Sequence, residues 1–214
     1  MTSSARGRLV ALEGIDGCGK STQARRLAER LGAVETHEPG ATALGQALRG
    51  LLLQPGTRVG SRAEALLMVA DRAQHIAEVI SPALDEGHWV VTDRFSASTL
   101  AYQGYGRGMD VGELGRLVDW AAGGLTPDLV VLLDVPVAVA VARRRGQAAD
   151  RLETLGAGFQ ERVAAGFAAL AAAEPARWAV VDATGVADAV ADVVLSTVVD
   201  RLGWPDGVER SADR

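Results

Sequence analysis

Residues 14–21 of this chain of 214 residues read Gly14-Ile15-Asp16-Gly17-Cys18-Gly19-Lys20-Ser21. They match the pattern G-x-x-x-x-G-K-[ST] at every fixed position. An apolar run over residues 9–12 precedes them, and a segment that favours a helix follows over residues 20–31. In this order of strand, glycine-rich loop and helix N-terminus, backbone N–H groups surround phosphate oxygens. A glycine-rich turn without a ligand is the alternative, and strand, spacing and helix together disfavour it.

Two side chains of this loop carry the chemistry. Lys20 would contact the β- and γ-phosphates of a nucleotide, and the Ser21 hydroxyl would bind Mg²⁺. Lys20 is the only lysine among the 22 basic residues, so a function that needs a lysine has one candidate. Cys18, the single cysteine, is interpreted as a small filler and not as a reactive thiol.

Composition and charge exclude several classes of function. The net charge of -5 and the pI near 5.3 argue against a general nucleic-acid-binding protein, which would carry a basic excess. We find no apolar stretch long enough to span a membrane and no apolar core of a signal peptide. A lone cysteine cannot form an internal disulfide bond. We therefore expect a soluble, cytoplasmic protein without nucleic-acid or membrane partners.

Short apolar runs alternate with longer helical segments, which is typical of a parallel sheet covered on both faces. We expect an α/β fold with five strands and a single domain over residues 1–214, with frayed ends near 1–6 and 205–214. The predicted strands are Leu9–Leu12, Ala33–Thr36, Trp89–Thr92, Leu129–Leu133 and Trp178–Val181. The predicted helices lie near residues 20–31, 43–53, 62–86, 111–123, 136–145, 155–173 and 186–202.

Asp93 and Arg94 follow the third apolar run directly. Ligands of open parallel sheets bind beyond the carboxyl ends of the strands. A carboxylate at that place can hold Mg²⁺ or its water, as enzymes with a phosphate-binding loop require. The alternative is a surface Asp-Arg pair that caps the next helix.

A phosphate-binding loop indicates that the protein binds a nucleoside triphosphate, but it does not show what the protein does with it. The candidate classes are a small-molecule kinase, a GTPase switch and an ATPase or regulatory module. The GTPase usually needs an N-K-x-D motif, and this chain has no asparagine. A kinase gathers arginines to neutralise the transferred phosphoryl group. The Arg143-Arg144-Arg145 run with Arg151 supplies such a cluster, although a solvated basic helix end explains it equally well.

Beyond these motifs, the chain closely resembles the thymidylate kinase family over nearly its whole length. The resemblance rests on EGIDGCGKST from Glu13, EPG from Glu38, ALRGLLL from Ala47, ADRAQH from Ala70, DRFSASTLAYQGYGRG from Asp93, PDL from Pro127, LDV from Leu133, DRLE from Asp150 and VDATG from Val181. It implies the P-loop nucleoside monophosphate kinase fold, with a helical lid over about residues 143–155. It also implies phosphoryl transfer from ATP to dTMP with Mg²⁺, giving dTDP and ADP in dTTP biosynthesis, and a homodimer.

The same resemblance assigns roles to individual residues. It places Asp16 on the acceptor's 3′-hydroxyl and Tyr102 against the deoxyribose, although a tyrosine of the core is the alternative for Tyr102. ATP contacts are implied for Gly14, Ile15, Asp16, Gly17, Cys18, Gly19, Lys20, Ser21, Thr22, Arg143 and Arg145. Acceptor contacts are implied for Asp16, Glu38, Pro39, Arg49, Met68, Arg72, Arg94, Thr99, Tyr102 and Gln103. The catalytic set is Lys20, Asp93, Arg94 and Arg151, and the metal ligands are Ser21 and Asp93.

Arginine positions distinguish members of the family. Gly17 occupies a loop position where some members carry an arginine, and members without it place catalytic arginines in the lid. Arg143, Arg145 and Arg151 would supply those here. We expect Arg151 to reach the transferred phosphoryl group and Arg143 to stack on adenine, near the turn over residues 182–185.

Two residues depart from the family pattern, namely His37 before EPG, where arginine is frequent, and Met68, where an aromatic residue stacks on thymine. Met68 lies four residues before Arg72, so both would face one base, and its sulfur can still pack on a ring. A core filler is the alternative for Met68. Leu66, Val69, Ala73, Ile76 and Ile80 would face the core. A kinase of another pyrimidine nucleotide or deoxynucleoside stays open, as does an ATPase or regulatory module.

Overall fold

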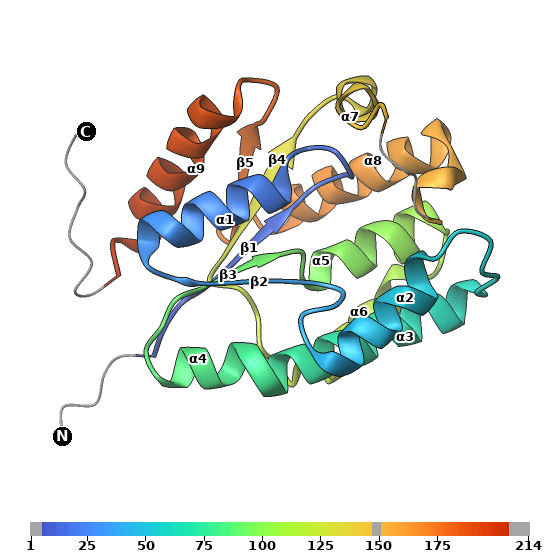
Figure 1. Ribbon diagram of the computed structural model, residues 1–214, viewed down its shortest axis with the longest axis horizontal. Helices are drawn as coiled ribbons and strands as arrows, with labels where there is room; N and C mark the ends of the chain where they lie inside the picture. Colours follow the sequence, from blue (N-terminus) through green and yellow to red (C-terminus); the bar gives the residue numbers. More distant parts are fainter. Residues whose placement is uncertain (1–5, 147–150, 206–214) are drawn as a thin grey trace.

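The computed structural model describes residues 6–146 and 151–205 and is built on one five-stranded parallel sheet (Figure 1). The strand order is β2-β3-β1-β4-β5, and every neighbouring pair is parallel. The predicted α/β fold class is therefore confirmed. The strands are β1 (Leu9–Glu13), β2 (Val34–His37), β3 (Val90–Asp93), β4 (Leu129–Asp134) and β5 (Trp178–Asp182).

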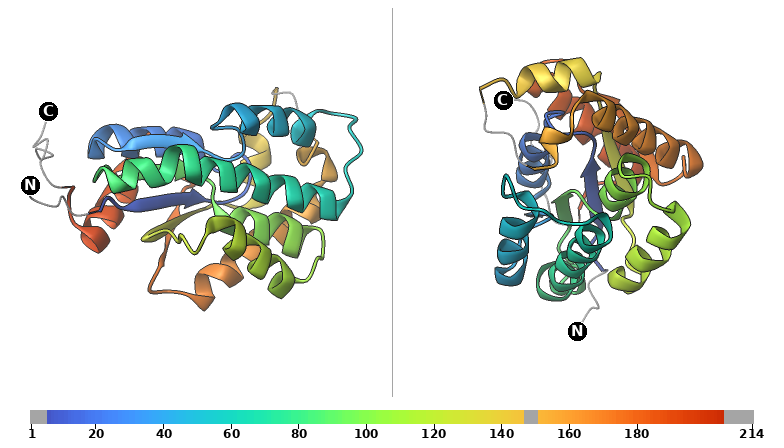
Figure 2. Two further views of the ribbon diagram at one scale, coloured as in Figure 1. Left: turned by 90° about the horizontal axis from the view of Figure 1, so that it is seen from below. Right: turned by 90° about the vertical axis from the view of Figure 1, so that its right-hand side faces the viewer.

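Helices cover both faces of this sheet (Figures 1 and 2). Helices α1 (Lys20–Leu31) and α9 (Ala187–Leu202) pack together on one face. The other face carries most of the remaining helices, in the arrangement that right-handed crossovers between parallel strands produce. Because both faces are covered, β1 is buried along its whole length, and the short apolar runs of the sequence become the core. The other helical segments are α2 (Ala43–Leu53), α3 (Ser61–His75), α4 (Ser81–Asp85), α5 (Ser96–Thr99), α6 (Val111–Ala122), α7 (Val137–Arg143) and α8 (Ala157–Ala173).

Three further turns of helix are irregular. The predicted helix over residues 62–86 is a continuous run in which the π-helical turn η1 (Ile76–Ile80) joins α3 to α4. A short 3₁₀ turn, η3 (Glu153–Leu155), precedes α8. Helix α5 and the π-helical turn η2 (Leu100–Gly106) were not predicted. Their sequence, SASTLAYQGYG, is rich in glycine, serine, threonine and tyrosine, which are weak helix formers, so tertiary packing decides their conformation.

Two details differ from the prediction. Leu66, expected in the core, is 55% exposed on α3, while Val69, Ile76 and Ile80 of the same stripe are buried as expected. Pro205, the first residue of the C-terminal end predicted to fray, is buried. Arg6 is exposed and belongs to no helix or strand, as predicted for the N-terminal end. The remaining residues of the predicted frayed ends, 1–5 and 206–214, and lid residues 147–150 lie outside the described residues. None of the helices in the described part is long and apolar enough to cross a membrane.

The central position of β1 sets the place of the phosphate-binding loop. Strand β1 pairs with β3 on one side and β4 on the other, with Leu12 opposite Asp93. The loop therefore leaves the sheet next to the residues that follow β3. Parallel strands end at the same edge, and the crevice beyond that edge is where such sheets bind ligands.

Candidate active site

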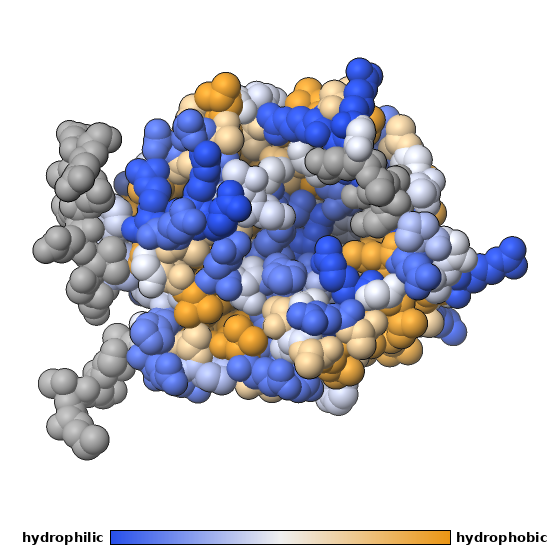
Figure 3. Space-filling view, viewed as in Figure 1, coloured by the Kyte–Doolittle hydropathy of each residue, from blue (hydrophilic) through white to orange (hydrophobic). Residues whose placement is uncertain are grey.

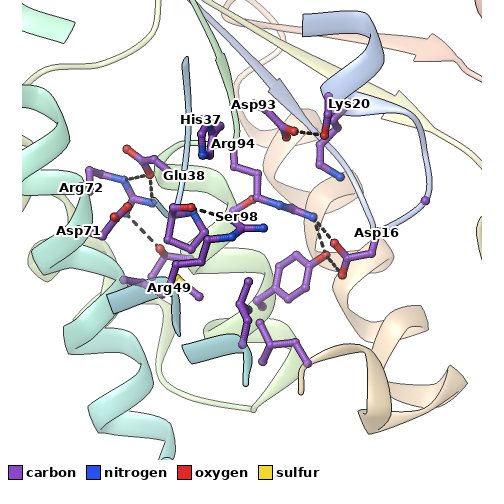
Figure 4. A pocket seen from close by; sticks show the side chains of 18 of the residues that line it. Asp16, Lys20, His37, Glu38, Arg49, Asp71, Arg72, Asp93, Arg94 and Ser98 are labelled. Carbon is purple, nitrogen blue, oxygen red and sulfur yellow. Dashed lines mark hydrogen bonds and ion pairs between the residues drawn. The ribbon is translucent and has the colours of Figure 1, made fainter. Parts of the chain in front are cut away.

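A cavity of about 720 Å³ opens at the carboxyl ends of the strands. In the space-filling view it is the hydrophilic hollow near the middle of the molecule (Figure 3). The phosphate-binding loop and the residues after β3 line one end, while α3 and the Glu38–Pro39 loop line the other (Figure 4). The cavity thus brings together residues that are far apart in the sequence.

The phosphate-binding loop forms the first end of the cavity. Gly19 has φ +103° and directly precedes α1, so the helix N-terminus faces the loop. The Lys20 side chain is buried, and its Nζ donates a 2.9 Å hydrogen bond to the Ile15 carbonyl oxygen. The side chains of Ile15 and Cys18 are buried in the core, so only their backbone is available to a ligand. Together the helix end, the lysine and the backbone make an anion-binding concavity.

Ser21 and Asp93 meet beside this loop. The Ser21 hydroxyl donates to Asp93 Oδ2 over 2.5 Å. The other oxygen, Asp93 Oδ1, is buried and has no hydrogen-bond partner among the described residues. A buried, unsatisfied carboxylate oxygen beside a hydroxyl fits the needs of a hard cation such as Mg²⁺. No group of three or more His, Cys, Asp or Glu side chains that could hold a metal occurs in the described part, so most ligands of such a cation would be water or substrate oxygens.

Arg94 connects the loop to the helical side of the cavity. Its backbone has φ +72°, a strained conformation for a residue other than glycine. Nη1 donates to the Gly14 carbonyl at 3.1 Å and to Ser98 Oγ at 2.9 Å. Nη2 donates to Asp16 Oδ1 at 2.5 Å and to the Tyr102 hydroxyl at 3.1 Å (Figure 4). A strained backbone that aims an arginine into a cavity indicates a functional position.

Asp16 and Tyr102 share this network. The Tyr102 hydroxyl donates to Asp16 Oδ2 at 2.7 Å, and the Arg94 guanidinium lies 4.9 Å from the centre of the Tyr102 ring. Burial favours a higher pKa for Asp16, but Arg94 and Lys20 outweigh it and the pKa is lowered. Burial raises the pKa of Tyr102 well above its usual value. Asp16 is therefore ionised and Tyr102 is a neutral hydroxyl at neutral pH.

Glu13 supports the same region from inside the sheet. This buried side chain accepts hydrogen bonds from the backbone N–H of Phe95 at 2.8 Å and from the Ser98 hydroxyl at 2.6 Å. Burial raises its pKa, although Arg94 acts in the opposite direction. Glu13 thereby links the end of β1 to the start of α5. These two segments cannot move apart without breaking the hydrogen bonds to Glu13.

A buried polar network forms the second end of the cavity. The Glu38 carboxylate pairs with Arg72 at 2.8 Å and with His75 Nδ1 at 3.0 Å. His75 Nε2 lies 2.6 Å from Thr36 Oγ1 on β2, the strand that precedes Glu38. Arg72 also donates to Thr99 Oγ1 at 3.1 Å. The network holds the Arg72 guanidinium as a rigid donor at the edge of the cavity.

The predicted phosphate arginine, Arg49, lies on α2 and contacts the loop after β2. The Glu38–Pro39 peptide bond is cis, and Arg49 Nη1 donates to the Pro39 carbonyl at 2.7 Å. His37 lies in the lining, and its partial burial together with Arg49 lowers its pKa. His37 is therefore mostly neutral at neutral pH and does not replace the positive charge of an arginine.

Asp71 is a cavity residue to which the sequence assigned no role. It is 1% exposed, Oδ1 accepts the Gly40 N–H at 3.0 Å, and Oδ2 has no partner among the described residues. Burial and the nearby Glu38 carboxylate raise its pKa to about 6. Only its membership of the ADRAQH motif marked this position in the sequence.

The base side of the predicted acceptor site is formed by α3, α5 and η2. Met68 is half-buried against the core and also lines the cavity with Thr99 and Gln103. Met68 thus packs against the core and also faces the cavity, and the stacking of a base on it stays a prediction. Gln103 Nε2 donates to Glu64 Oε1 at 2.9 Å.

The four arginines near the predicted lid lie in different environments. Arg143 donates to the carbonyls of Ala183 at 2.8 Å and of Thr184 at 3.0 Å, which brings it to the predicted adenine turn. Arg145 is exposed and outside the cavity lining. Arg151 is buried against α3, where its Nη2 pairs with Glu64 at 2.6 Å, and it also lies outside the lining.

Arg144, which the sequence did not single out, lines the cavity. A Cβ at position 17 would meet the Ala140 carbonyl oxygen at 2.5 Å and Arg144 Cδ at 2.9 Å. The Arg144 side chain thus occupies the space beside Gly17. Three consecutive arginines look alike in the sequence, and the fold brings Arg143 and Arg144, but not Arg145, to the cavity lining.

Comparison with known proteins identifies the family. A sequence model described as thymidylate kinase matches residues 12–194. The chain belongs to the thymidylate kinase family. A thymidylate kinase of Synechococcus sp. (strain CC9902) is 49% identical over 208 residues, covering 92% of this chain and 99% of the relative. One of Chromobacterium violaceum is 49% identical over 197 residues, covering 89% and 93%. The crystal structure of thymidylate kinase from Ehrlichia chaffeensis matches with a TM-score of 0.76 at 30% identity, covering 90% and 99%.

The thymidylate kinase resemblance therefore named the right family and fold. The described structure also places most of the implied contact residues around one cavity. Those in the lining are Asp16, Gly17, Gly19, Lys20, Ser21, Thr22, Glu38, Pro39, Arg49, Met68, Arg72, Asp93, Arg94, Thr99, Tyr102, Gln103 and Arg143. Sequence reasoning gave no role to Glu13 and Asp71, because their contacts arise from packing between distant segments, and it named Arg144 only as part of the arginine run.

Proposed function

We propose that the chain transfers a phosphoryl group from ATP to dTMP, giving ADP and dTDP for dTTP synthesis. The observation that carries this proposal is the two-ended cavity, with an anion-binding loop at one end and a buried donor network at the other. Arg94 and Asp16 bridge the two ends. Names of relatives at about half identity over most of the chain support the same reaction.

In this proposal, the ATP phosphates bind to the loop and Lys20, and the dTMP phosphate lies between Arg49 and Arg94. Phosphoryl transfer depends mainly on alignment and on neutralising the charge of the transferred group. No side-chain base is needed, because the attacking dTMP phosphate is already ionised. Asp16 and Tyr102 would hold the deoxyribose, so that the acceptor phosphate points at ATP.

Ser21 and Asp93 would hold Mg²⁺ together with the ATP phosphates. When bound, the ion would neutralise phosphate charge during transfer. The unsatisfied Asp93 Oδ1 supports this assignment. Mg²⁺ commonly keeps few protein ligands and relies on substrate phosphates.

The chain would act as one domain over residues 1–214, with a lid over about residues 143–155. Arg143 would contact the adenine side, while Arg145 and Arg151 would serve the phosphates. For Arg151 this requires release from Glu64 and a turn toward the loop, because the ion pair holds it away from the cavity. Arg144 is added to this set, since its place beside Gly17 supports a contact with ATP phosphates.

A coupled assay of ADP release tests the reaction. ATP and Mg²⁺ are supplied with dTMP, dUMP, dCMP, other nucleoside monophosphates or deoxynucleosides in parallel. The proposal expects dTMP to give the highest kcat/KM. A stronger signal from another pyrimidine nucleotide or a deoxynucleoside would favour that kinase instead. ADP release equal to the ATP-only control with every acceptor would favour an ATPase or regulatory module.

We also propose a homodimer in the cytoplasm. Exposed apolar side chains on two helices that pack together support an interface, namely Leu66 at 55% on α3 and Trp120 at 80% on α6. Trp120→Glu should convert the protein to a monomer in analytical ultracentrifugation. A wild-type monomer at micromolar concentration would contradict the dimer.

A further inference from the structure

Glu64 is a fully buried carboxylate on α3 that lies outside the cavity lining, and the proposed reaction gives it no role beyond its ion pair with Arg151. It is 0% exposed and accepts hydrogen bonds from three side chains. Arg107 Nη2 lies 2.8 Å from Oε2 and Arg151 Nη2 lies 2.6 Å from the same oxygen. Gln103 Nε2 lies 2.9 Å from Oε1. A carboxylate without solvent contact, between two cations and one amide, is a costly arrangement that needs a reason.

The charges around Glu64 determine its hydrogen-bonding character. Burial alone would raise its pKa, but hydrogen bonds from Arg107, Gln103 and Arg151 lower it. The side chain is therefore ionised near neutral pH. An ionised carboxylate has no proton to donate and can only accept hydrogen bonds.

This property fixes the orientation of the Gln103 amide. An amide has an NH₂ donor end and a carbonyl acceptor end of nearly the same shape, and its hydrogen-bonding partners decide which end points where. If the carbonyl end of Gln103 faced Glu64, its oxygen would be repelled by the carboxylate oxygens. The NH₂ end therefore faces Glu64. Gln103 is 1% exposed and lines the cavity. With its nitrogen held by Glu64, its carbonyl oxygen is the end that is left for a ligand.

We propose that Glu64 is a positioning residue for base selection, which holds Gln103 with its carbonyl oxygen toward the cavity to accept a hydrogen bond from the N3–H of an imide base. The proposal rests on the proposed phosphorylation of a pyrimidine nucleotide at this site. Arg72 lines the cavity nearby and can only donate. A donor and an acceptor together complement the O4 and N3–H edge of thymine or uracil.

Cytosine presents the opposite pattern at this edge. Its N3 is an acceptor and its exocyclic N4 is a donor, so each group would face a like group of the protein. Leaving buried polar groups unpaired is one of the stronger ways in which a site rejects a near-isosteric substrate. Selection of the base by hydrogen bonds to Arg72 and Gln103 does not depend on stacking, so it does not require the aromatic residue that family members carry at the position of Met68.

The experiment compares kcat/KM for dTMP, dUMP and dCMP in the wild type, Glu64→Gln and Glu64→Asp. The glutamine has nearly the same shape but can turn an NH₂ group toward Gln103, which frees the Gln103 amide to reverse. We expect the dTMP-to-dCMP ratio to fall about tenfold or more in Glu64→Gln. Glu64→Asp keeps a side chain that only accepts, so it should retain the ratio even if both rates fall. The dTMP-to-dUMP ratio should stay constant throughout, because both bases share the imide edge.

Arg107→Gln is the matched control, since it removes a cation from Glu64 but leaves the carboxylate facing Gln103. It should keep the dTMP-to-dCMP ratio. An equal loss of activity on dTMP and dCMP in Glu64→Gln would assign Glu64 a purely structural role and overturn the proposal. A wild type that does not phosphorylate dTMP would instead refute the proposed function, whatever the variants do.

A spectroscopic measurement covers the case in which Glu64→Gln does not fold. In nitrogen-15 spectra of the wild type, the Gln103 NH₂ signals are assigned by their loss in Gln103→Met. We expect an NH₂ proton that exchanges slowly with solvent without ligand and keeps its shift when dTMP binds. Fast exchange, or a large shift on dTMP binding, would show that the NH₂ end faces the cavity and would overturn the proposal.

Discussion

Asp71 places a charge where the protein gives it little compensation, and replacing it with asparagine should stabilise the fold. Its side chain is 1% exposed, accepts one hydrogen bond from Gly40 and has an unpartnered second oxygen. Asp71→Asn keeps the shape and the Oδ1 acceptor and removes the negative charge beside Glu38. Such a substitution is stabilising only where ionisation costs free energy in the folded state.

The magnitude follows from the pKa of the carboxyl group. Burial and Glu38 raise that pKa from 3.8 to about 6. At about 1.4 kcal/mol for each pKa unit, ionised Asp71 costs about 3 kcal/mol of folding free energy. Because the folded-state pKa is raised, the cost is absent below pH 3.8, grows between there and about pH 6, and is complete above that.

Urea unfolding followed by circular dichroism measures this cost. We expect Asp71→Asn to exceed the wild type in unfolding free energy by about 3 kcal/mol near pH 7.5. Near pH 5 the folded wild type is largely protonated at Asp71, and the advantage should shrink by about 1 to 1.5 kcal/mol. The other carboxyl groups titrate in both proteins, so their contributions cancel in the difference.

The pH dependence separates charge from packing. If asparagine stabilised or destabilised the fold by the same amount near pH 5 and near pH 7.5, the effect would come from shape or hydrogen bonding. The inference that Asp71 carries an uncompensated charge would then be wrong. Asp71→Leu is a useful comparison, since it removes the charge and also the acceptor for Gly40, and should be less stable than Asp71→Asn at both pH values.

Three further changes test the site. Lys20→Ala should lower kcat by about 10²-fold or more while circular dichroism stays unchanged, and near-normal turnover would contradict its phosphate contact. Met68→Phe should lower the KM for dTMP if the base stacks there, while an unchanged KM would leave Met68 as a core residue. Gly17→Ala should lower the thermal unfolding temperature, because φ is +87° and the new Cβ would lie 2.5 Å from the Ala140 carbonyl oxygen. Gly115→Ala, in an open position on α6, is its control, and equal stability of the two variants would refute the steric argument.

Contiguous motifs were the part of the site that the sequence could predict. The loop over residues 14–21 and the Asp93-Arg94 pair each combine a short apolar strand with polar residues at its carboxyl end. In a parallel sheet the carboxyl ends of the strands lie at the same edge. The local sequence pattern was therefore sufficient to predict that the loop and the Asp93-Arg94 pair lie close together. The five strands were predicted for the same reason, since their apolar runs are short and bounded by helical segments.

Contacts between distant segments were not accessible in this way. The Glu38 network joins α3 to β2 and to the loop that follows β2. The Glu64 cluster joins α3, η2 and residues after α7. A single sequence does not reveal which buried polar groups will face each other. Helix α5 with η2 was missed because its residues have low helix propensity, and Leu66 was misplaced because a helical period marks an apolar face but not what covers it.

The crowding around Gly17 links the sequence at position 17 to the sequence at position 144. A Cβ at position 17 would lie 2.9 Å from Arg144 Cδ and 2.5 Å from the Ala140 carbonyl oxygen. An arginine at position 17 therefore requires the flexible Arg144 side chain to turn away and the Ala140 backbone to shift. The effect of a substitution at position 17 depends on the residue at position 144, so we expect these two positions to be epistatic.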